Sequence, residues 1–132
     1  MNEPLLFDTD VLIDAGRGVS EAIDTLAAAA REDRISVITE MELLVGCRDK
    51  EEQRTFYDFL DTYGAEIFQI HAPISADAAE LMRRHQLSHN LRIPDALIAA
   101  TARWRDCQLV TKNQKDFRPI DDLVLPSYPP PI

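Results

Sequence analysis

The chain has 132 residues, of which 45% are hydrophobic and 28% are charged. This length suits one domain of ordinary size with a core that needs no disulfide staples, and the hydrophobic content excludes a wholly disordered chain. No hydrophobic run reaches the ~18 residues of a membrane span, and the N-terminus lacks the basic-then-hydrophobic order of a signal peptide. We therefore expect residues 1–132 to form a single domain that does not act at a membrane.

Charge is unevenly distributed along the sequence. The formal net charge of −9 argues against a general nucleic-acid binder. Residues 83–118 nevertheless carry 8 Lys or Arg against 3 Asp, whereas residues 1–82 carry 18 acidic against 6 basic side chains. This pattern fits solvated helix faces, and it also fits a basic rim for a polyanion beside an acidic centre.

The two cysteines indicate the cellular compartment in which the protein is expected. Cys47 and Cys107 lie far apart in the sequence, in no metal-binding spacing, and both fall in helical patterns. Core or near-surface thiols of this kind persist in a reducing compartment. We therefore expect a cytoplasmic protein.

Short hydrophobic strands alternate with helices. In chain order, the pattern predicts a strand at 4–9, a helix at 20–31, a strand at 35–38, helices at 39–49 and 50–63, a strand at 66–70, helices at 76–87 and 94–106, a strand at 108–111, a polar turn at 112–117 and an edge strand at 122–125. Ser20, Thr39 and Ser75 are the expected helix caps, and Pro94 suits a first helical position. The Pro-rich tail, 126–132, should be extended along the surface or serve as a contact arm.

This alternation predicts an α/β fold, in which helices cover both faces of a mainly parallel sheet. In such sheets, ligands bind outside the carboxyl ends of the strands. The residues that follow each predicted strand are therefore the candidates for chemistry.

Four acidic residues fall at that edge of the predicted sheet. Asp8 lies at the carboxyl end of the first strand, and Glu42 lies one turn into the helix after the second. Asp95 lies in the first turn of the helix that Pro94 opens, and Asp116 follows the fourth strand. Four carboxylates on one rim repel each other, and a hard divalent cation such as Mg²⁺ or Mn²⁺, which prefers oxygen ligands, relieves that repulsion.

Three of these acids also have purely structural interpretations. Glu42 stands three residues after Thr39, which is the spacing of a capping box. Asp95 suits the positive end of its helix, and Asp116 suits a turn that its side chain caps. Asp8 has the fewest structural uses, because a carboxylate inside a strand core is costly to bury unless something pairs with it. We therefore take the four acids together as the candidate metal site.

Two further carboxylates and a pair of histidines have weaker claims. If the first strand persists to residue 10, Asp10 shares the Asp8 side of it by alternation, which makes Asp10 a candidate for an auxiliary ligand or for a residue that contacts the ligands. Asp14 is expected to face solvent. His85 and His89 have the i, i+4 spacing of a helical metal site, but no H-E-x-x-H motif accompanies them, so we assign them no metal.

Four blocks of the sequence together resemble the PIN-domain ribonucleases, and in particular the VapC toxins of bacterial and archaeal toxin–antitoxin pairs. The blocks, in this order, are FDTDVLID, SVITEMELLVG, IPDALIAATA and LVTKNQKDF. The likeness runs from Leu5 to about Phe117, and the last two blocks are its most specific part. The resemblance implies a three-layer α/β/α PIN-like domain with a mainly parallel central sheet.

The resemblance also implies the site residues. The acids that match the family pattern would surround one or two Mg²⁺ or Mn²⁺ ions, and they are Asp8, Glu42, Asp95 and Asp116. Thr111 and Asn113 match the polar positions of the family's T-x-N-x-x-D-F block and would steady the site.

Asp10 departs from the family pattern, which usually has Asn or Ser at this position. The extra negative charge would either strengthen metal binding or discourage the RNA phosphate, and so bears on turnover more than on the fold. The family's toxins usually form homodimers and bind an antitoxin encoded beside them. The resemblance therefore implies both a second copy and an antitoxin as partners.

The activity expected from this resemblance is metal-dependent hydrolysis of RNA phosphodiesters by an endoribonuclease. Asp8 and Asp95 would hold the principal ion, while Glu42 and Asp116 would hold a second ion or orient the attacking water. The candidate phosphate contacts, which would position RNA without reading its sequence, are Arg92, Arg103, Lys112, Lys115 and Arg118.

Two other functions stay open on the sequence. In a phosphatase of the haloacid dehalogenase kind, Asp8 and Asp10 would supply the nucleophile and the general acid, with the remaining roles falling to Thr39, Lys112 and Asp121–Asp122. That fold usually has a longer chain, and no Gly-Thr follows D-x-D here. In a non-catalytic interaction module, the acids would only cap helices, and the chain would bind no divalent cation.

Overall fold

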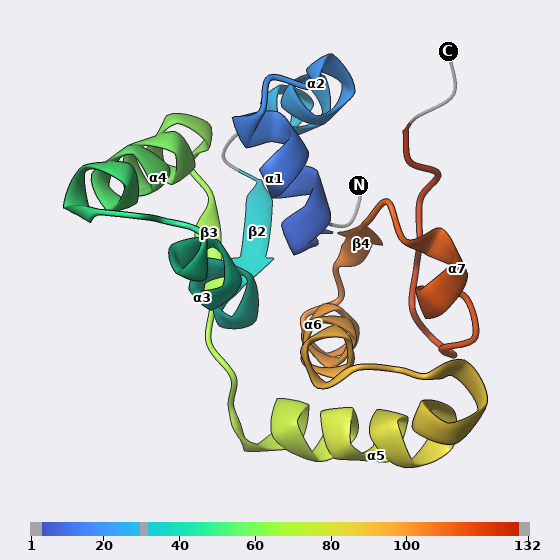
Figure 1. Ribbon diagram of the computed structural model, residues 1–132. Coiled ribbons are helices and arrows are strands. Elements are labelled where there is room, and N and C mark those ends of the chain that lie inside the picture. Colours follow the sequence, from blue (N-terminus) through green and yellow to red (C-terminus); the bar gives the residue numbers. More distant parts are fainter. Residues whose placement is uncertain (1–3, 30–31, 130–132) are drawn as a thin grey trace.

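The fold is described from a computed structural model that places residues 4–29 and 32–129 (Figure 1). The elements in chain order are β1 Leu5–Phe7, α1 Thr9–Gly16, α2 Ser20–Ala28, β2 Asp33–Ser36, α3 Val37–Val45, α4 Lys50–Tyr63, β3 Glu66–Phe68, α5 Ala72–His89, α6 Ile93–Trp104, β4 Gln108–Val110 and α7 Gln114–Phe117. The ends of the predicted helix at 20–31 and of the tail at 126–132 lie outside the described residues. No helix within the described ranges is long and apolar enough to cross a lipid bilayer.

The strands form one sheet in the order β3-β2-β1-β4. β1 lies between β2 and β4, with Leu6 paired to Arg34 on one side and to Leu109 on the other. β3 continues the sheet beyond β2, and all three pairings are parallel. The predicted parallel sheet is therefore confirmed, and its strands share one carboxyl edge.

Helices cover both faces of the sheet, which confirms the predicted three-layer α/β/α arrangement (Figure 1). One core cluster joins Leu6 and Leu109 to α5 and α6. The other joins Phe7 and Val110, the next residues of the same strands, to α1, α2 and α4. Successive side chains of a strand point to opposite faces, so strands that are hydrophobic on both sides need helices on both sides.

The first strand ends earlier than predicted. The sequence indicates a strand over 4–9, but β1 stops at Phe7 and an unpredicted helix, α1, begins at Thr9. The cause is Asp8, which caps α1 by accepting a hydrogen bond from the Thr9 backbone N–H. Asp10 therefore lies in the first turn of α1, and its predicted placement by strand alternation is wrong.

The start of α3 also differs from the prediction. Ser36, and not Thr39, caps this helix, and its hydroxyl oxygen accepts a hydrogen bond from the Ile38 backbone N–H at 3.0 Å. β2 accordingly ends at Ser36, two residues before the predicted end. Thr39 lies inside the helix, so the capping box predicted for Thr39 and Glu42 is wrong.

Two more predicted caps lie inside their helices. α5 begins at Ala72 with Pro73 in its first turn, a position that suits Pro, so Ser75 is helical. Ser20 is the first residue of α2, whose cap is Val19. In both cases the helix begins earlier than the capping residue type predicts.

The segments around β4 complete the corrections. The polar turn predicted at 112–117 contains the short helix α7. The described residues at 122–125 form no strand, although the Leu109 backbone N–H donates a hydrogen bond to the Val124 carbonyl at 2.9 Å. Cys47 follows α3 and Cys107 precedes β4, so neither lies in a helix as predicted, and neither forms a disulfide within the described residues.

Asp33, at the start of β2, is a buried carboxylate away from the predicted site. Its side chain is 0% exposed, and neither carboxylate oxygen has a hydrogen-bond partner among the described residues. Burial raises its pKa from 3.8 to about 7, against the opposing effect of the Arg34 charge. Between about pH 4 and about pH 7 the folded protein therefore holds a proton that the unfolded chain has lost, so stability falls as pH rises through this window.

We predict that Asp33→Asn raises Tm by several degrees at about pH 8 and changes it little at about pH 5, because the amide resembles the protonated acid and carries no charge. The raised pKa corresponds to at most about 4 kcal/mol. Thermal unfolding at both pH values measures the effect, and the exposed Asp58→Asn controls for the loss of a negative charge. An Asp33→Asn protein less stable than the wild type at pH 8 would contradict the prediction.

Candidate active site

Asp8 occupies the carboxyl end of β1, an inner strand of the sheet. It is 7% exposed, and its Oδ1 and Oδ2 accept hydrogen bonds at 2.8 Å each from the Thr9 backbone N–H and the Thr111 hydroxyl. Burial raises the pKa of Asp8 to about 7, and the charges of Asp10 and Asp95 add to the rise, while the two hydrogen bonds oppose it. This carboxyl group is therefore partly protonated near neutral pH.

The loop after β4 holds Asp8 from the other side. Thr111 is fully buried, and its hydroxyl donates to Asp8 while accepting from the Asn113 backbone N–H at 3.0 Å. The Asn113 side chain donates from Nδ2 to Asp116 Oδ2 at 2.8 Å. Each of the two polar residues expected to steady the site thus contacts one of the predicted acids.

Glu42 reaches the same edge from α3. The Thr9 hydroxyl lies 2.7 Å from Glu42 Oε1 and 3.0 Å from the Thr39 hydroxyl. Because a hydroxyl carries one proton, we assign Thr9 as the donor to the carboxylate and as the acceptor from Thr39. Thr39, which is fully buried, therefore orients Thr9 instead of capping the helix.

Asp95, in the first turn of α6, joins the group through its charge. Burial raises the pKa of Asp95, the Arg92 charge opposes the rise, and the charges of Asp116 and Glu42 add to it. Asp95 in turn raises the pKa of Asp8. Electrostatic repulsion thus links all four predicted acids, although they come from four separate parts of the chain.

Asp10 and Asp14, the two other acids of FDTDVLID, contact the loop after β4. Asp10 Oδ2 accepts from the Lys112 backbone N–H at 3.2 Å and lies 3.4 Å from the Thr111 hydroxyl. Burial raises the pKa of Asp10, and these contacts oppose the rise. The sequence predicts a solvent-facing Asp14, but its side chain is 16% exposed and pairs with Lys112 Nζ at 2.9 Å. That prediction is wrong, because the loop after β4 folds against α1.

The acidic group fits a hard divalent cation by the chemistry of its donors. All the candidate ligands are carboxylates, and the pKa is raised, mainly by burial, in Asp8, Asp10 and Asp95. A bound cation would favour the charged form of each. As placed, no group of three or more His, Cys, Asp or Glu among the described residues could hold an ion, so these side chains would have to close around it.

Three of the five basic residues considered for RNA binding lie exposed near these acids. Arg92 is the exposed N-cap of α6, and its charge acts on Asp95 in the first turn of the same helix. Lys115 and Arg118 flank Asp116 in and after α7, and both are exposed. These three side chains are therefore free to meet a phosphate at the acidic edge.

The other two basic residues have carboxylate partners. Lys112 is paired with Asp14, as described above. Arg103 lies in the last turn of α6 and pairs with Asp77 at 3.6 Å. The helix places it about 12 Å from Asp95, which lies in the first turn. The structure thus separates Arg103 from the acidic edge.

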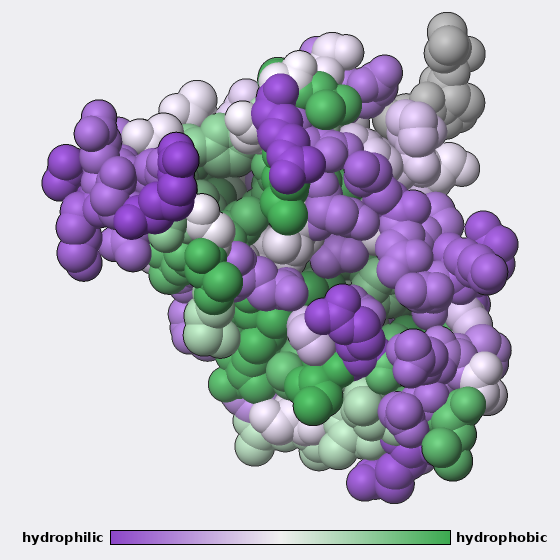
Figure 2. All heavy atoms as spheres, in the orientation of Figure 1, coloured by the Kyte–Doolittle hydropathy of each residue, from purple (hydrophilic) through white to green (hydrophobic). Residues whose placement is uncertain are grey.

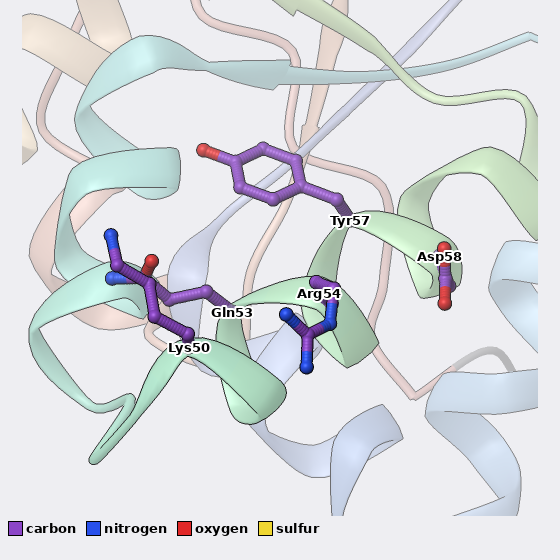
Figure 3. Close-up of a pocket in the computed structure, with 5 residues that line it drawn as sticks. All are labelled: Lys50, Gln53, Arg54, Tyr57 and Asp58. Atoms are coloured by element: carbon purple, nitrogen blue, oxygen red, sulfur yellow. The ribbon is translucent and has the colours of Figure 1, made fainter.

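Two other features lie outside the acidic group. His85 and His89 on α5 have ring centroids 5.7 Å apart, and no acid joins them in a metal-binding group within the described residues. A pocket of about 310 Å³ on α4 is lined by Lys50, Gln53, Arg54, Tyr57 and Asp58 (Figure 3). Tyr57 points from it towards α3, where its hydroxyl donates to Glu40 Oε2 at 2.6 Å. None of the four predicted acids lines this pocket.

Two residues of the site carry little signal in the sequence. Thr9 orients Glu42, and its one clue is a hydroxyl set between two acids in D-T-D. Gln114 donates from Nε2 to the Thr111 carbonyl at 2.8 Å, but it stands in a stretch that the sequence marks only as a polar turn.

Comparison with known proteins finds relatives of this chain. The sequence pattern described as the PIN domain matches residues 5–123. The chain is 37% identical over 128 residues to Ribonuclease VapC10 of Mycobacterium tuberculosis, and the alignment covers 92% of each protein.

Solved structures show the same likeness. A toxin–antitoxin complex from Klebsiella pneumoniae matches with a TM-score of 0.78 and 34% identity, over 97% of this chain and 99% of that chain. VapBC2 from Rickettsia felis, bound to a DNA fragment from its promoter, matches with a TM-score of 0.74 and 28% identity, over 92% of this chain and 96% of that chain.

We predict that Mg²⁺ or Mn²⁺ raises Tm, and that the increase is larger at about pH 8 than at about pH 6. At the higher pH Asp8 is ionised, whereas at the lower pH a cation has to displace its proton. Asp95→Asn should lose most of the increase, and the exposed Asp58→Asn should keep it. Thermal unfolding with and without added cation gives the measurement. Equal increases in the wild type and in Asp95→Asn would contradict a site that includes Asp95.

Proposed function

Because the chain belongs to the PIN-domain family, we propose that it is an endoribonuclease that hydrolyses RNA phosphodiesters at the carboxyl edge of its sheet. The similarity to Ribonuclease VapC10 over 92% of both proteins supports this activity. The similarity to toxin–antitoxin complexes supports its role as the toxin of such a pair. The single observation that carries the site is the buried carboxylate of Asp8, whose pKa of about 7 reflects burial and neighbouring acids.

In the proposed reaction, four acids form the metal site. Asp8 and Asp95 hold the principal divalent ion, Mg²⁺ or Mn²⁺, and Glu42 and Asp116 complete the site. The ion, when bound, supplies an activated water and offsets the charge that develops on the phosphate. Two threonine hydroxyls keep the carboxylates oriented. The Thr111 hydroxyl donates to Asp8 at 2.8 Å, and the Thr9 hydroxyl donates to Glu42 at 2.7 Å.

Exposed cations beside the acids are the proposed contacts for the RNA backbone. Arg92 lies at the start of α6, and Lys115 and Arg118 lie around α7. Such contacts position the strand without reading its sequence. We leave Lys112 and Arg103 out of the proposed set, because carboxylates already pair with both.

Neither alternative function accounts for these findings. The PIN-domain match over residues 5–123 favours hydrolysis of RNA over both a phosphatase and a non-catalytic module. Thr39, which the phosphatase needs at the site, is buried against Thr9, and Asp121 and Asp122 are exposed after α7. We therefore set both alternatives aside.

An exposed hydrophobic patch on α3 and the start of α6 supports a homodimer. Met41, Val45 and Ile93 are 50%, 87% and 66% exposed, and Figure 2 shows hydrophobic surface over both helices. Hydrophobic surface of this kind marks contacts between proteins. We propose the patch as the contact between two copies, and an antitoxin protein as the second partner, as in the complexes that this chain resembles.

The extent of the domain and its compartment are also inferences. Both core clusters pack against the same sheet, which supports a single domain over residues 1–132. A cytoplasmic location stays a prediction, and it accords with the lack of a disulfide at Cys47 and Cys107 in the described part of the chain.

We predict that the antitoxin-free protein cleaves RNA from a panel of structured and unstructured substrates when Mg²⁺ or Mn²⁺ is present, and that a chelator stops cleavage. Asp8→Asn and Asp95→Asn should each slow cleavage by at least about a hundredfold, because each removes a charge on which the ion depends. Asp58→Asn, exposed on α4, is the matched control and should keep full activity. Cleavage that persists in chelator, or at the wild-type rate in Asp8→Asn, would contradict the proposed reaction.

Val45→Arg is predicted to convert the dimer to a monomer, because it places a charge in the hydrophobic patch at its most exposed member. Light scattering after size exclusion measures the mass. Val124→Arg is the control, since Val124 is 48% exposed but lies near β4 and outside the patch. A dimeric Val45→Arg protein would rule out the patch as the contact between copies.

A further inference from the structure

Residues 124–128, here called the strap, cross the open edge of the sheet beside β4 (red segment, Figure 1). The strap begins where the Leu109 backbone N–H donates to the Val124 carbonyl at 2.9 Å. Leu125 packs against the core cluster of α5 and α6, and Tyr128 packs against the cluster of α1, α2 and α4. The strap therefore joins the two helical layers around the edge strand.

Gln114 connects the strap to the loop after β4. Its Nε2 donates to the Pro126 carbonyl at 3.2 Å and to the Thr111 carbonyl at 2.8 Å. Both protons of one amide group are therefore used, one on the strap and one on the loop. Gln114 is half-buried, so its side chain is partly shielded from competing water.

The peptide group between Thr111 and Lys112 is held from two sides. Its carbonyl accepts from Gln114, and its N–H donates to Asp10 Oδ2 at 3.2 Å. The C=O and N–H of a trans peptide point in opposite directions, so rotation of this group breaks both bonds together. The Thr111 hydroxyl donates to Asp8 at 2.8 Å. The orientation of one peptide thus affects two carboxylates of the candidate site.

We propose that Gln114 is a positioning residue, which uses the strap to hold the peptide between residues 111 and 112 in the orientation that Asp8 and Asp10 require. The effect of Gln114 on catalysis rests on the proposed function, whereas the link that Gln114 makes between the strap and the loop does not. Loss of the link loosens the loop at 111–116 and leaves both core clusters in place. The strap therefore contributes, through Gln114, to the orientation of Asp8 and Asp10.

Hydrogen exchange at single amides, followed by NMR in the protein without added metal, tests the link. Gln114→Met keeps the length of the side chain and removes both donors, and a chain ending at Leu125 removes the carbonyl on the strap. In each, the Lys112 and Asn113 amides should exchange about fivefold to thirtyfold faster, the factor that one or two neutral hydrogen bonds supply. Amides within α6 should keep their rates. Gln86→Met, exposed on α5, is the matched control and should change neither group.

The two changes made together give a sharper result. Because Gln114 and the strap act through the same bond, their combined effect on exchange should be smaller than the product of the two single effects. Independent, fully multiplied effects would overturn the proposal. So would unchanged exchange at Lys112 in Gln114→Met, or exchange that is equally faster throughout α6.

RNA cleavage supplies the second readout. In Gln114→Met, kcat should fall by about fivefold to thirtyfold while KM stays within about twofold, because the residue acts on the carboxylates and not on the RNA. Faster exchange with an unchanged kcat would reject the positioning role. Faster exchange in a protein whose wild type cleaves no RNA would instead reject the proposed function and retain the link between strap and loop.

Discussion

A negative charge held almost out of water is the constraint on which the candidate site depends. Asp8 stands at the end of an inner strand, is only 7% exposed, and has the charges of Asp10 and Asp95 acting on it. Hydrogen bonds from the Thr9 N–H and the Thr111 hydroxyl reduce the penalty of this burial only in part, and the pKa stays near 7. The stability lost in burying Asp8 would be recovered if a cation bound, so the same feature that weakens the fold would favour the binding of metal.

Hydroxyl groups orient two of the four acids, Asp8 and Glu42. Thr111 fixes Asp8, and Thr39 acts on Glu42 through Thr9. A hydroxyl donates a hydrogen bond without neutralising the carboxylate, whereas a Lys or Arg in its place would compete with a divalent ion for the same charge. The ammonium group of Lys112 instead pairs with Asp14, where it closes the loop after β4 against α1.

The topology of the sheet could be predicted from the sequence, because strands hydrophobic on both sides require helices on both faces. The same rule grouped Asp8, Glu42, Asp95 and Asp116, since the carboxyl ends of parallel strands share an edge whatever the side chains do. Helix starts were less predictable: Ser36 and Thr39 are both capping residue types, and the residue at which β2 ends, which the sequence does not display, decides between them.

Contacts between distant side chains could not be predicted. The bond from Thr9 to Glu42 spans 33 residues, and the bond from Gln114 to the strap spans 12. Each depends on a rotamer and on a loop path that hydrophobic periodicity does not specify. The Thr9 hydroxyl and the Gln114 amide therefore emerge as parts of the site only from the folded structure.

The scatter of the acids along the chain has a consequence for biosynthesis. A nascent chain grows from its N-terminus, so it contains Asp8 and Glu42 long before β4 is made. Until then β1 lacks one of its two neighbours, Thr111 is missing beside Asp8, and Asp116 has not been added. A ribonuclease built in this order has no complete site while most of it is being translated.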